Sequence, residues 1–195
     1  MRKKSHISLA GLLVRDLHAQ ELWKHRKAFY WGSILPDCKP SFLTTKHEFD
    51  GTFEMLRVKI EKLTEEINQG NFQPRKYAIE LGEVIHYMAD YFTFPHNKHY
   101  PGDLRNHCVY ENYLKFGLRS YIKSDRSNIK KYTGNWFVEK EELFAYIEKM
   151  HKEYVSCERT VEEDCEYIVG VCYQVAISIL QLLEIKSENE ICLIS

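Results

Sequence analysis

The stretch from Glu80 to Asn97 restricts the fold most, because it predicts a helix that is apolar on almost every side. Large apolar side chains recur at helical spacing along one face, and small or apolar residues fill most of the rest. A helix of this kind must be surrounded by other elements, so we expect it at the centre of a helical bundle. The apolar face contains Leu81, Val84, Ile85, Met88 and Phe92, and the narrow polar wedge contains Glu80, Glu83, Tyr87 and Tyr91.

The same stretch carries three residues that can bind a metal ion. His86 and Asp90 are four residues apart, so they lie on one face of the predicted helix. Pro95 cannot continue a helix, which is expected to end at or before Phe94 and to present His96 from a different direction. A buried carboxylate must be paired or must coordinate a metal ion, and this arrangement predicts a metal site. A histidine that is hydrogen-bonded within the core is the alternative.

A second pair with the same spacing, His107 and Glu111, follows on a helix that Asp103 is expected to cap. With nine histidines and 28 acidic residues in 195 positions, chance alone places an acidic residue four positions after about one histidine. Two such pairs, His86/Asp90 and His107/Glu111, lie on the predicted helices, whereas His99/Asp103 has the same spacing but falls in a loop that contains Pro101 and Gly102. Neither pair alone distinguishes a metal-binding pair from a structural histidine.

The remaining periodicity is helical, and no clear strand or internal repeat is present. We expect an all-α fold, a multi-helix bundle in one domain over residues 1–187, followed by a loose C-terminal tail over residues 188–195. Glycine and proline residues are expected to place Asp37 on a loop. We expect a first helix that Ser5 caps and a short second helix from about Glu21. Further helices are expected at about Thr52–Asn68, in the stretch around His86, after Asp103, at about Val138–Tyr154 and at about Thr160–Lys186. Ser120–Asn135 is expected to be a polar surface segment.

Composition and terminal segments bear on the location of the chain. The net charge is −1 and the pI is about 6.8, so nothing in the overall charge favours a polyanionic partner. The N-terminal apolar run is cut by Arg15 and Asp16 and makes a poor signal peptide. Val169–Leu183 is interrupted by Gln174 and is expected to be too short for a transmembrane segment. The six cysteines show no CxxC spacing. We therefore expect a cytoplasmic protein with reduced thiols and leave its oligomeric state open.

The candidate ligands form an ordered set along the chain, and this set resembles the zinc-dependent phospholipase C family and the related tri-zinc single-strand nucleases. The most specific part of the resemblance is the His-x3-Asp-x5-His spacing, with a proline just before the last histidine. The family's next helix carries His-x3-Glu or His-x3-Asp, and upstream it has an aspartate, a histidine and an early histidine on the first helix. His18 and His25 are alternatives for that early histidine. The matching residues here are His6, Asp37, His47, His86, Asp90, His96, His107 and Glu111.

The resemblance implies an all-α fold that holds a cluster of zinc ions. One zinc ion would be bound by Asp37, His47, His86 and Asp90. A second, more exposed ion would be bound by His96, His107 and Glu111, and a third by His6 together with Asp90 as a bridge. These side chains suit zinc, although iron and manganese accept the same ligand types.

The N-terminus departs from the family pattern. Family members complete the third site with the amine and carbonyl of an N-terminal tryptophan, which this sequence lacks. Met1 lies five residues before His6, and our hypothesis is that Met1 supplies the amine and the carbonyl instead. A two-zinc site with a frayed terminus is the alternative, so we expect two or three zinc ions per chain.

The resemblance implies a hydrolase, a zinc-dependent phosphodiesterase of the phospholipase C type, in which metal-bound hydroxide attacks phosphorus. Asp37 is the candidate catalytic base, and no residue is assigned to substrate binding. The expected substrate is a phosphodiester, with a phospholipid head group as one candidate and nucleic acid left open. Two alternatives remain: a nuclease or small-molecule phosphodiesterase with the same metal cluster, and a non-catalytic helical protein that zinc stabilises.

Overall fold

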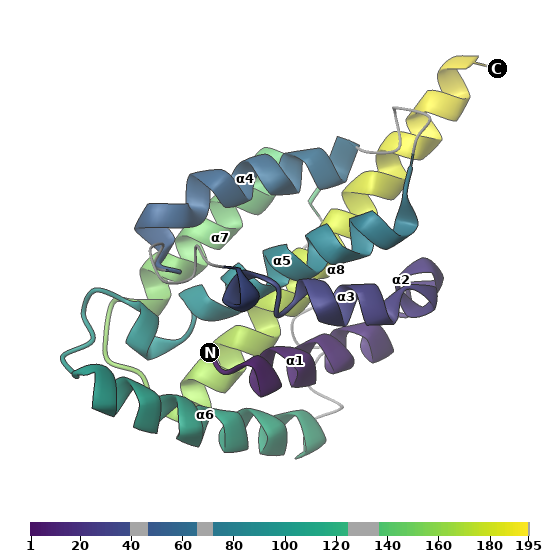
Figure 1. Ribbon diagram of the computed structural model, residues 1–195. Coiled ribbons are helices and arrows are strands. Elements are labelled where there is room, and N and C mark those ends of the chain that lie inside the picture. Colours follow the sequence, from purple (N-terminus) through teal and green to yellow (C-terminus); the bar gives the residue numbers. More distant parts are fainter. Residues whose placement is uncertain (40–46, 66–71, 125–136, 195) are drawn as a thin grey trace.

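The computed structural model describes residues 1–39, 47–65, 72–124 and 137–194, and the expectation of an all-α fold is confirmed over these ranges (Figure 1). The helices pack around α5 and α8, which cross the middle of the molecule. Their order and bounds are α1 Lys3–Asp16, α2 Gln20–Lys24, α3 Arg26–Gly32, η1 Pro36–Cys38, α4 Phe49–Glu65, α5 Pro74–Tyr91, η4 Phe94–His96, α6 Leu104–Ser124, α7 Lys140–Tyr154 and α8 Val161–Ile194.

Helix α5 is the central helix that its sequence predicts. It packs against α1, α3, α4 and α8, so neighbours cover it from several directions. The apolar face is buried, with Leu81, Val84 and Met88 completely removed from solvent. Burying each such side chain contributes about 1.5–3 kcal/mol to folding. His86 and Asp90 are also completely buried, which confirms that the pair lies in the core.

Helix α8 forms a second buried rod. Cys165, Ile168, Cys172 and Ile179 are all buried on it, and the described cysteines are free thiols. By length and hydropathy the segment Val161–Glu184 could cross a membrane, so the prediction that the apolar stretch Val169–Leu183 is too short was wrong. However, 72% of the most apolar window of this segment is buried inside the structure. Burial of that kind is typical of a core helix. The helix then continues to Ile194 and projects beyond its neighbours (Figure 1), where a loose tail was expected.

The helix boundaries test the capping predictions. Helix α5 ends at Tyr91, before Pro95, as expected. Asp103 accepts a hydrogen bond from the backbone N–H of Asn106 at 2.8 Å, so it caps α6 as predicted. The prediction for Ser5 was wrong, because α1 begins at Lys3 and Ser5 lies buried inside the helix. Helix α4 begins slightly earlier than predicted; its predicted end at residues 66–68 lies outside the described residues, as does most of the predicted surface segment, residues 125–135.

Helices α3 and α5 approach each other through two glycines. A Cβ on Gly82 would lie 2.5 Å from the carbonyl oxygen of Phe29, and one on Gly32 would lie 2.1 Å from the carbonyl oxygen of Ile79. Atoms of the backbone occupy both positions, so no larger residue fits without moving a helix. This approach allows the Ser33 carbonyl at the end of α3 to accept a hydrogen bond from Nδ1 of His86 at 2.9 Å.

We expect Gly82→Ala to destabilise the fold by about 1–3 kcal/mol, because the new methyl group forces α3 away from α5. Gly51→Ala on α4 is the matched control, since a Cβ there meets nothing within 4 Å; it should be neutral or stabilising by up to about 1 kcal/mol. Urea unfolding followed by circular dichroism measures both. Equal stability of the two variants would contradict the close approach of α3 and α5.

Candidate metal centre

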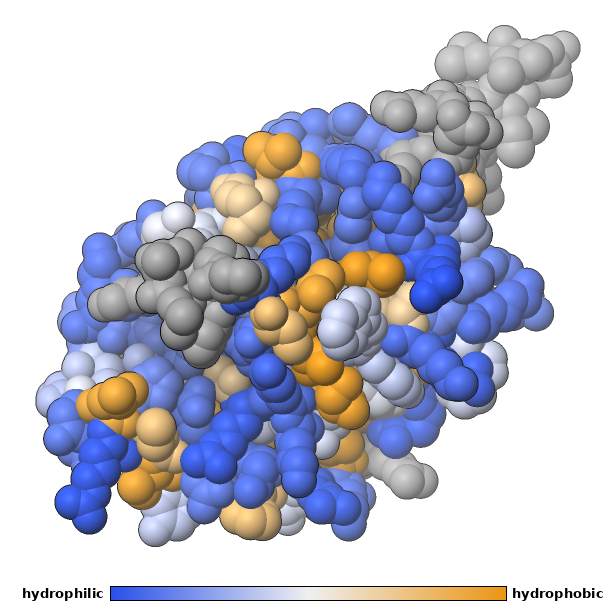
Figure 2. Space-filling model, in the orientation of Figure 1, coloured by the Kyte–Doolittle hydropathy of each residue, from blue (hydrophilic) through white to orange (hydrophobic). Residues whose placement is uncertain are grey.

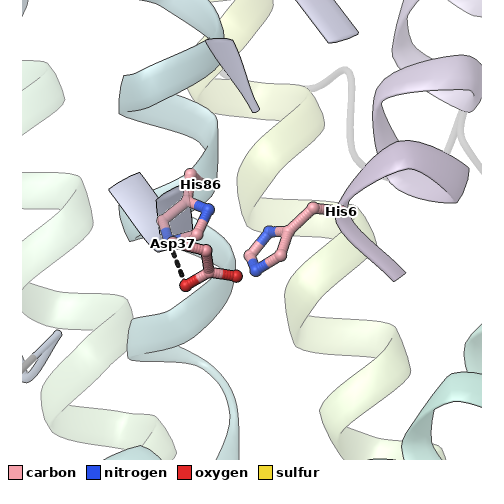
Figure 3. A group of neighbouring side chains, drawn as sticks. All are labelled: His6, Asp37 and His86. Atoms are coloured by element: carbon pink, nitrogen blue, oxygen red, sulfur yellow. Dashed lines mark ion pairs between the residues drawn. The ribbon is translucent and has the colours of Figure 1, made fainter. Parts of the chain in front are cut away.

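The structure brings together every residue that the sequence predicts as a metal ligand. The candidate ligands come from several parts of the bundle: His6 lies on α1, Asp37 on η1 and His47 just before α4, and the others lie on α5, η4 and α6. Three groups have ligand atoms within 4.8 Å of one another: His6, Asp37 and His86; His47, His86 and Asp90; and His96, His107 and Glu111. Figure 3 shows the first group converging from three separate elements.

Asp90 is the centre of this cluster. Its two carboxylate oxygens face nitrogen atoms from four other elements, and the side chain is completely buried. Burial alone would raise the pKa of Asp90, but the surrounding amine and imidazole groups outweigh burial and hold it well below its usual value. Its nearest neighbours are the Met1 amine at 2.6 Å, His47 Nδ1 at 3.0 Å, His86 Nε2 at 3.2 Å, His6 Nε2 at 3.4 Å and His96 Nδ1 at 3.8 Å.

The His86 ring is oriented by the backbone. Because the Ser33 carbonyl can only accept, Nδ1 of His86 must carry the hydrogen of their 2.9 Å bond. In the neutral ring, Nε2 then carries the lone pair. Asp90, His47 and the nearer carboxylate oxygen of Asp37 surround this nitrogen, and the Asp37 oxygen lies 3.6 Å from it. A backbone carbonyl that fixes the tautomer of a metal-binding histidine is a common arrangement around metal sites.

His6 is the clearest sign that the cluster needs another partner. Its ring is 1% exposed, and neither ring nitrogen has a hydrogen-bond partner among the described residues. The ring stacks on His86 with the centroids 4.0 Å apart. Burial, helped by the nearby His86, lowers the pKa of His6 to about 3. A neutral, buried imidazole without a partner is costly, and a metal ion would satisfy it.

The group on α6 and η4 is more open, as expected for the second site. Glu111 Oε1 lies 3.3 Å from Nε2 of His107 and 3.4 Å from Nε2 of His96. These three side chains are only partly buried, and all three line a cavity of about 410 Å³. Asp37 and His47 line the same cavity, so a molecule from solvent can reach both groups.

The N-terminus enters the cluster and is not frayed. Met1 is 4% exposed, and its amine lies 2.6 Å from Asp90, 3.0 Å from Nε2 of His96 and 3.2 Å from Glu111. Burial would lower the pKa of this amine, but Asp90 and Glu111 raise it above its usual value. The amine therefore occupies a position where a cation is favoured.

The chemistry of these groups fits zinc. Imidazole nitrogens and carboxylate oxygens converge in tight groups, and two buried nitrogens, His47 Nδ1 and His86 Nε2, lie only 3.1 Å apart. Zinc accepts both ligand types and readily adopts sites of three or four ligands. The alternatives for the early histidine lie elsewhere: His18 follows the end of α1 with a φ of 53°, and His25 lies between α2 and α3. Neither belongs to the three groups.

One residue that supports the cluster, Asp164, was not predicted from the sequence. Asp164 on α8 is completely buried and accepts hydrogen bonds from the backbone N–H of Phe94 at 3.0 Å, from Tyr110 at 3.1 Å and from Tyr154 at 2.5 Å. Burial raises its pKa to about 6. Phe94 begins η4, which carries His96. The only sequence signal was an acidic residue on the apolar side of α8, next to Cys165.

We expect Asp164→Asn to weaken metal binding at the His96 group by about tenfold, because an amide cannot accept from all three donors and η4 loosens. Chelator competition with zinc measures the affinity. Glu162→Gln, at an exposed neighbouring position, is the control and should leave affinity unchanged. Lower stability with unchanged zinc affinity would show that Asp164 supports only the fold.

Comparison with known proteins agrees with the geometry. Residues 5–161, most of the chain, match the model of the family described as zinc dependent phospholipase C. No curated protein and no solved structure matches the chain. The matched range includes every candidate ligand from His6 to Glu111. The chain belongs to the zinc-dependent phospholipase C family.

Proposed function

We propose that this protein is a zinc-dependent phosphodiester hydrolase that acts on a phospholipid-type substrate. The observation that carries the proposal is the convergence of seven histidine and acidic side chains around the buried Asp90, beside a cavity that opens to solvent. A structural zinc site is closed by its protein ligands. Here the ligand groups line a cavity large enough for a small polar head group, which favours catalysis.

We assign the candidate ligands to three sets, each for one ion, as the family resemblance implies; the third set differs from the group of neighbouring atoms in the structure, where His6 lies with Asp37 and His86. Zinc bound there would lower the pKa of a nearby water molecule and neutralise charge on phosphoryl oxygens. Asp90 would join the sets, since both of its oxygens face ligand nitrogens. The proposed sets are Asp37, His47, His86 and Asp90; His96, His107 and Glu111; and His6, Asp90 and Met1.

Asp37 has the position required of a general base. It lies on η1, lines the cavity and is only partly enclosed by the cluster. Burial raises its pKa above the usual value, although His86 opposes this effect. A carboxylate with a raised pKa accepts a proton more readily from a water molecule in the cavity. Its oxygen is also close enough to His86 to act as a ligand, at 3.6 Å.

We expect the protein, purified without added metal or chelator, to contain two or three zinc ions by elemental analysis and to hydrolyse a phospholipid in micelles. Single-stranded DNA and a nitrophenyl phosphodiester are the comparison substrates. Faster hydrolysis of DNA would favour the nuclease alternative. Zinc without turnover of any of the three would favour a structural role, and a folded protein without metal would contradict the proposal.

Asp37→Asn separates the two roles of this residue. If Asp37 is the base, turnover should fall by about 10²–10⁴-fold while most of the zinc stays bound. Loss of zinc together with activity would identify Asp37 mainly as a ligand, and unchanged turnover would exclude the base role. Glu48→Gln is the control, since Glu48 lines the same cavity but belongs to none of the three ligand groups.

The contribution of Met1 can be tested by extending the chain before it. Two extra residues would remove the free amine from its position 2.6 Å from Asp90, and we expect one zinc ion fewer per chain, with the other sites retained. The same two residues added after Ser195 serve as the control. An N-terminally extended protein with three zinc ions and full activity would show that Met1 is not a ligand.

A further inference from the structure

A second hollow lies beside the metal centre, on the seam between α1 and α6. These two helices pack against each other (Figure 1). Met1, just before α1, and four residues at the start of α6, namely Leu104, His107, Cys108 and Glu111, help line the metal-centre cavity. Further along the same two helices lies a groove of about 500 Å³, lined by Lys3, Lys4, Ile7, Ser8, Lys115, Phe116 and Arg119. The groove and the cavity therefore follow each other along one pair of helices.

The outer face of α6 is apolar where a surface helix is normally polar. Val109, Tyr113 and Phe116 are spaced by four and three residues, so they form one stripe. They are 48%, 65% and 59% exposed, and Leu104 at the start of the helix is 78% exposed. Figure 2 shows apolar side chains set among hydrophilic ones along the lower edge, where α6 lies. Exposed apolar side chains that share one helix face and are rimmed by polar residues are typical of an interaction surface.

Positive charge surrounds this stripe without acidic partners. Lys3, Lys4, Arg105, Arg119 and Lys123 are all exposed, and none of them forms an ion pair within the described part of the chain. The whole chain carries a net charge of −1, so the positive charge is local to this face. By contrast, basic residues on α4 such as Lys59 and Lys62 are paired with glutamates.

The groove also holds a basic side chain against an aromatic one. The Lys115 ammonium group lies 4.2 Å from the centre of the Phe116 ring and donates to Asn112 at 3.1 Å. Ile7 extends the apolar surface onto α1 and is 37% exposed. Large apolar side chains flanked by lysine and arginine are the pattern of helices that lie in the interface of a bilayer.

We propose that this face, defined by Lys3, Lys4, Ile7, Val109, Phe116 and Arg119, docks onto the surface of a bilayer that contains anionic phospholipids. The basic residues would attract the surface, and the apolar stripe would enter the headgroup region. Ile7, Leu104 and Val109 are exposed aliphatic side chains, which gain little against a nucleic acid, because its backbone is bound by positive charge and its bases stack on aromatic rings. This proposal rests on the proposed function and adds to it that the substrate is a lipid in a membrane.

The test is cosedimentation of the zinc-loaded protein with vesicles of phosphatidylcholine alone or with 30% phosphatidylserine. We expect at least tenfold stronger binding to the anionic vesicles, weakened by salt. Replacing Lys3, Lys4 and Arg119 with glutamine should lower this binding by about 100-fold, and V109S/F116S should lower it at least tenfold. Glutamine at Lys27, Lys149 and Lys152, exposed positions outside this face, is the charge-matched control and should change binding less than twofold.

Three outcomes would overturn the proposal: no preference for anionic vesicles, an equal loss of binding in the control, or a V109S/F116S variant whose only change is loss of a dimer in size-exclusion chromatography. Turnover of the soluble nitrophenyl phosphodiester should be the same in all variants as in the original protein. Cosedimentation reports the bound protein and does not depend on hydrolysis. Failure of docking is therefore distinguishable from failure of the proposed hydrolysis.

Discussion

The rest of the structure depends on one buried carboxylate. Asp90 lies in the middle of the bundle without solvent contact, and an ionised carboxylate in that position is costly unless positive or hydrogen-bonding groups surround it. The N-terminus, α1, the residue before α4, and η4 each direct a nitrogen atom at it. The path of the chain around α5 brings these nitrogens together, and their convergence makes the centre able to hold metal.

The first turn of α1 shows how this centre overrides local rules. Ser5 has the side chain of a helix cap, yet the helix starts at Lys3. The Met1 amine lies against Asp90 and Glu111, which fixes the chain so early that Ser5 falls inside the helix. Tertiary contacts commonly override such local preferences. A capping motif can be seen in a sequence, but an ion pair between residues 89 positions apart cannot.

The centre of the fold was predictable because its signals are local. The periodicity of α5, its end before Pro95 and the cap at Asp103 depend on neighbouring residues, and all three are confirmed. The helical continuation of α8 to Ile194 also has a local basis, since no glycine or proline follows Gly170. The support from Ser33 and Asp164 was not predictable. Both act through contacts between distant elements, by a backbone carbonyl and by a single buried carboxylate.

Helix α6 connects the metal centre to the surface. Its inner side carries the buried Leu114 and Leu118 together with the candidate ligands His107 and Glu111, while its outer side carries the exposed stripe that begins at Val109. Because a helix is rigid over this length, the direction of the ligands and the direction of the stripe cannot change independently. A surface that contacts the stripe is therefore held at a constant orientation to the cavity. Under the proposed docking, this constant orientation would set the direction in which the bilayer surface faces the cavity.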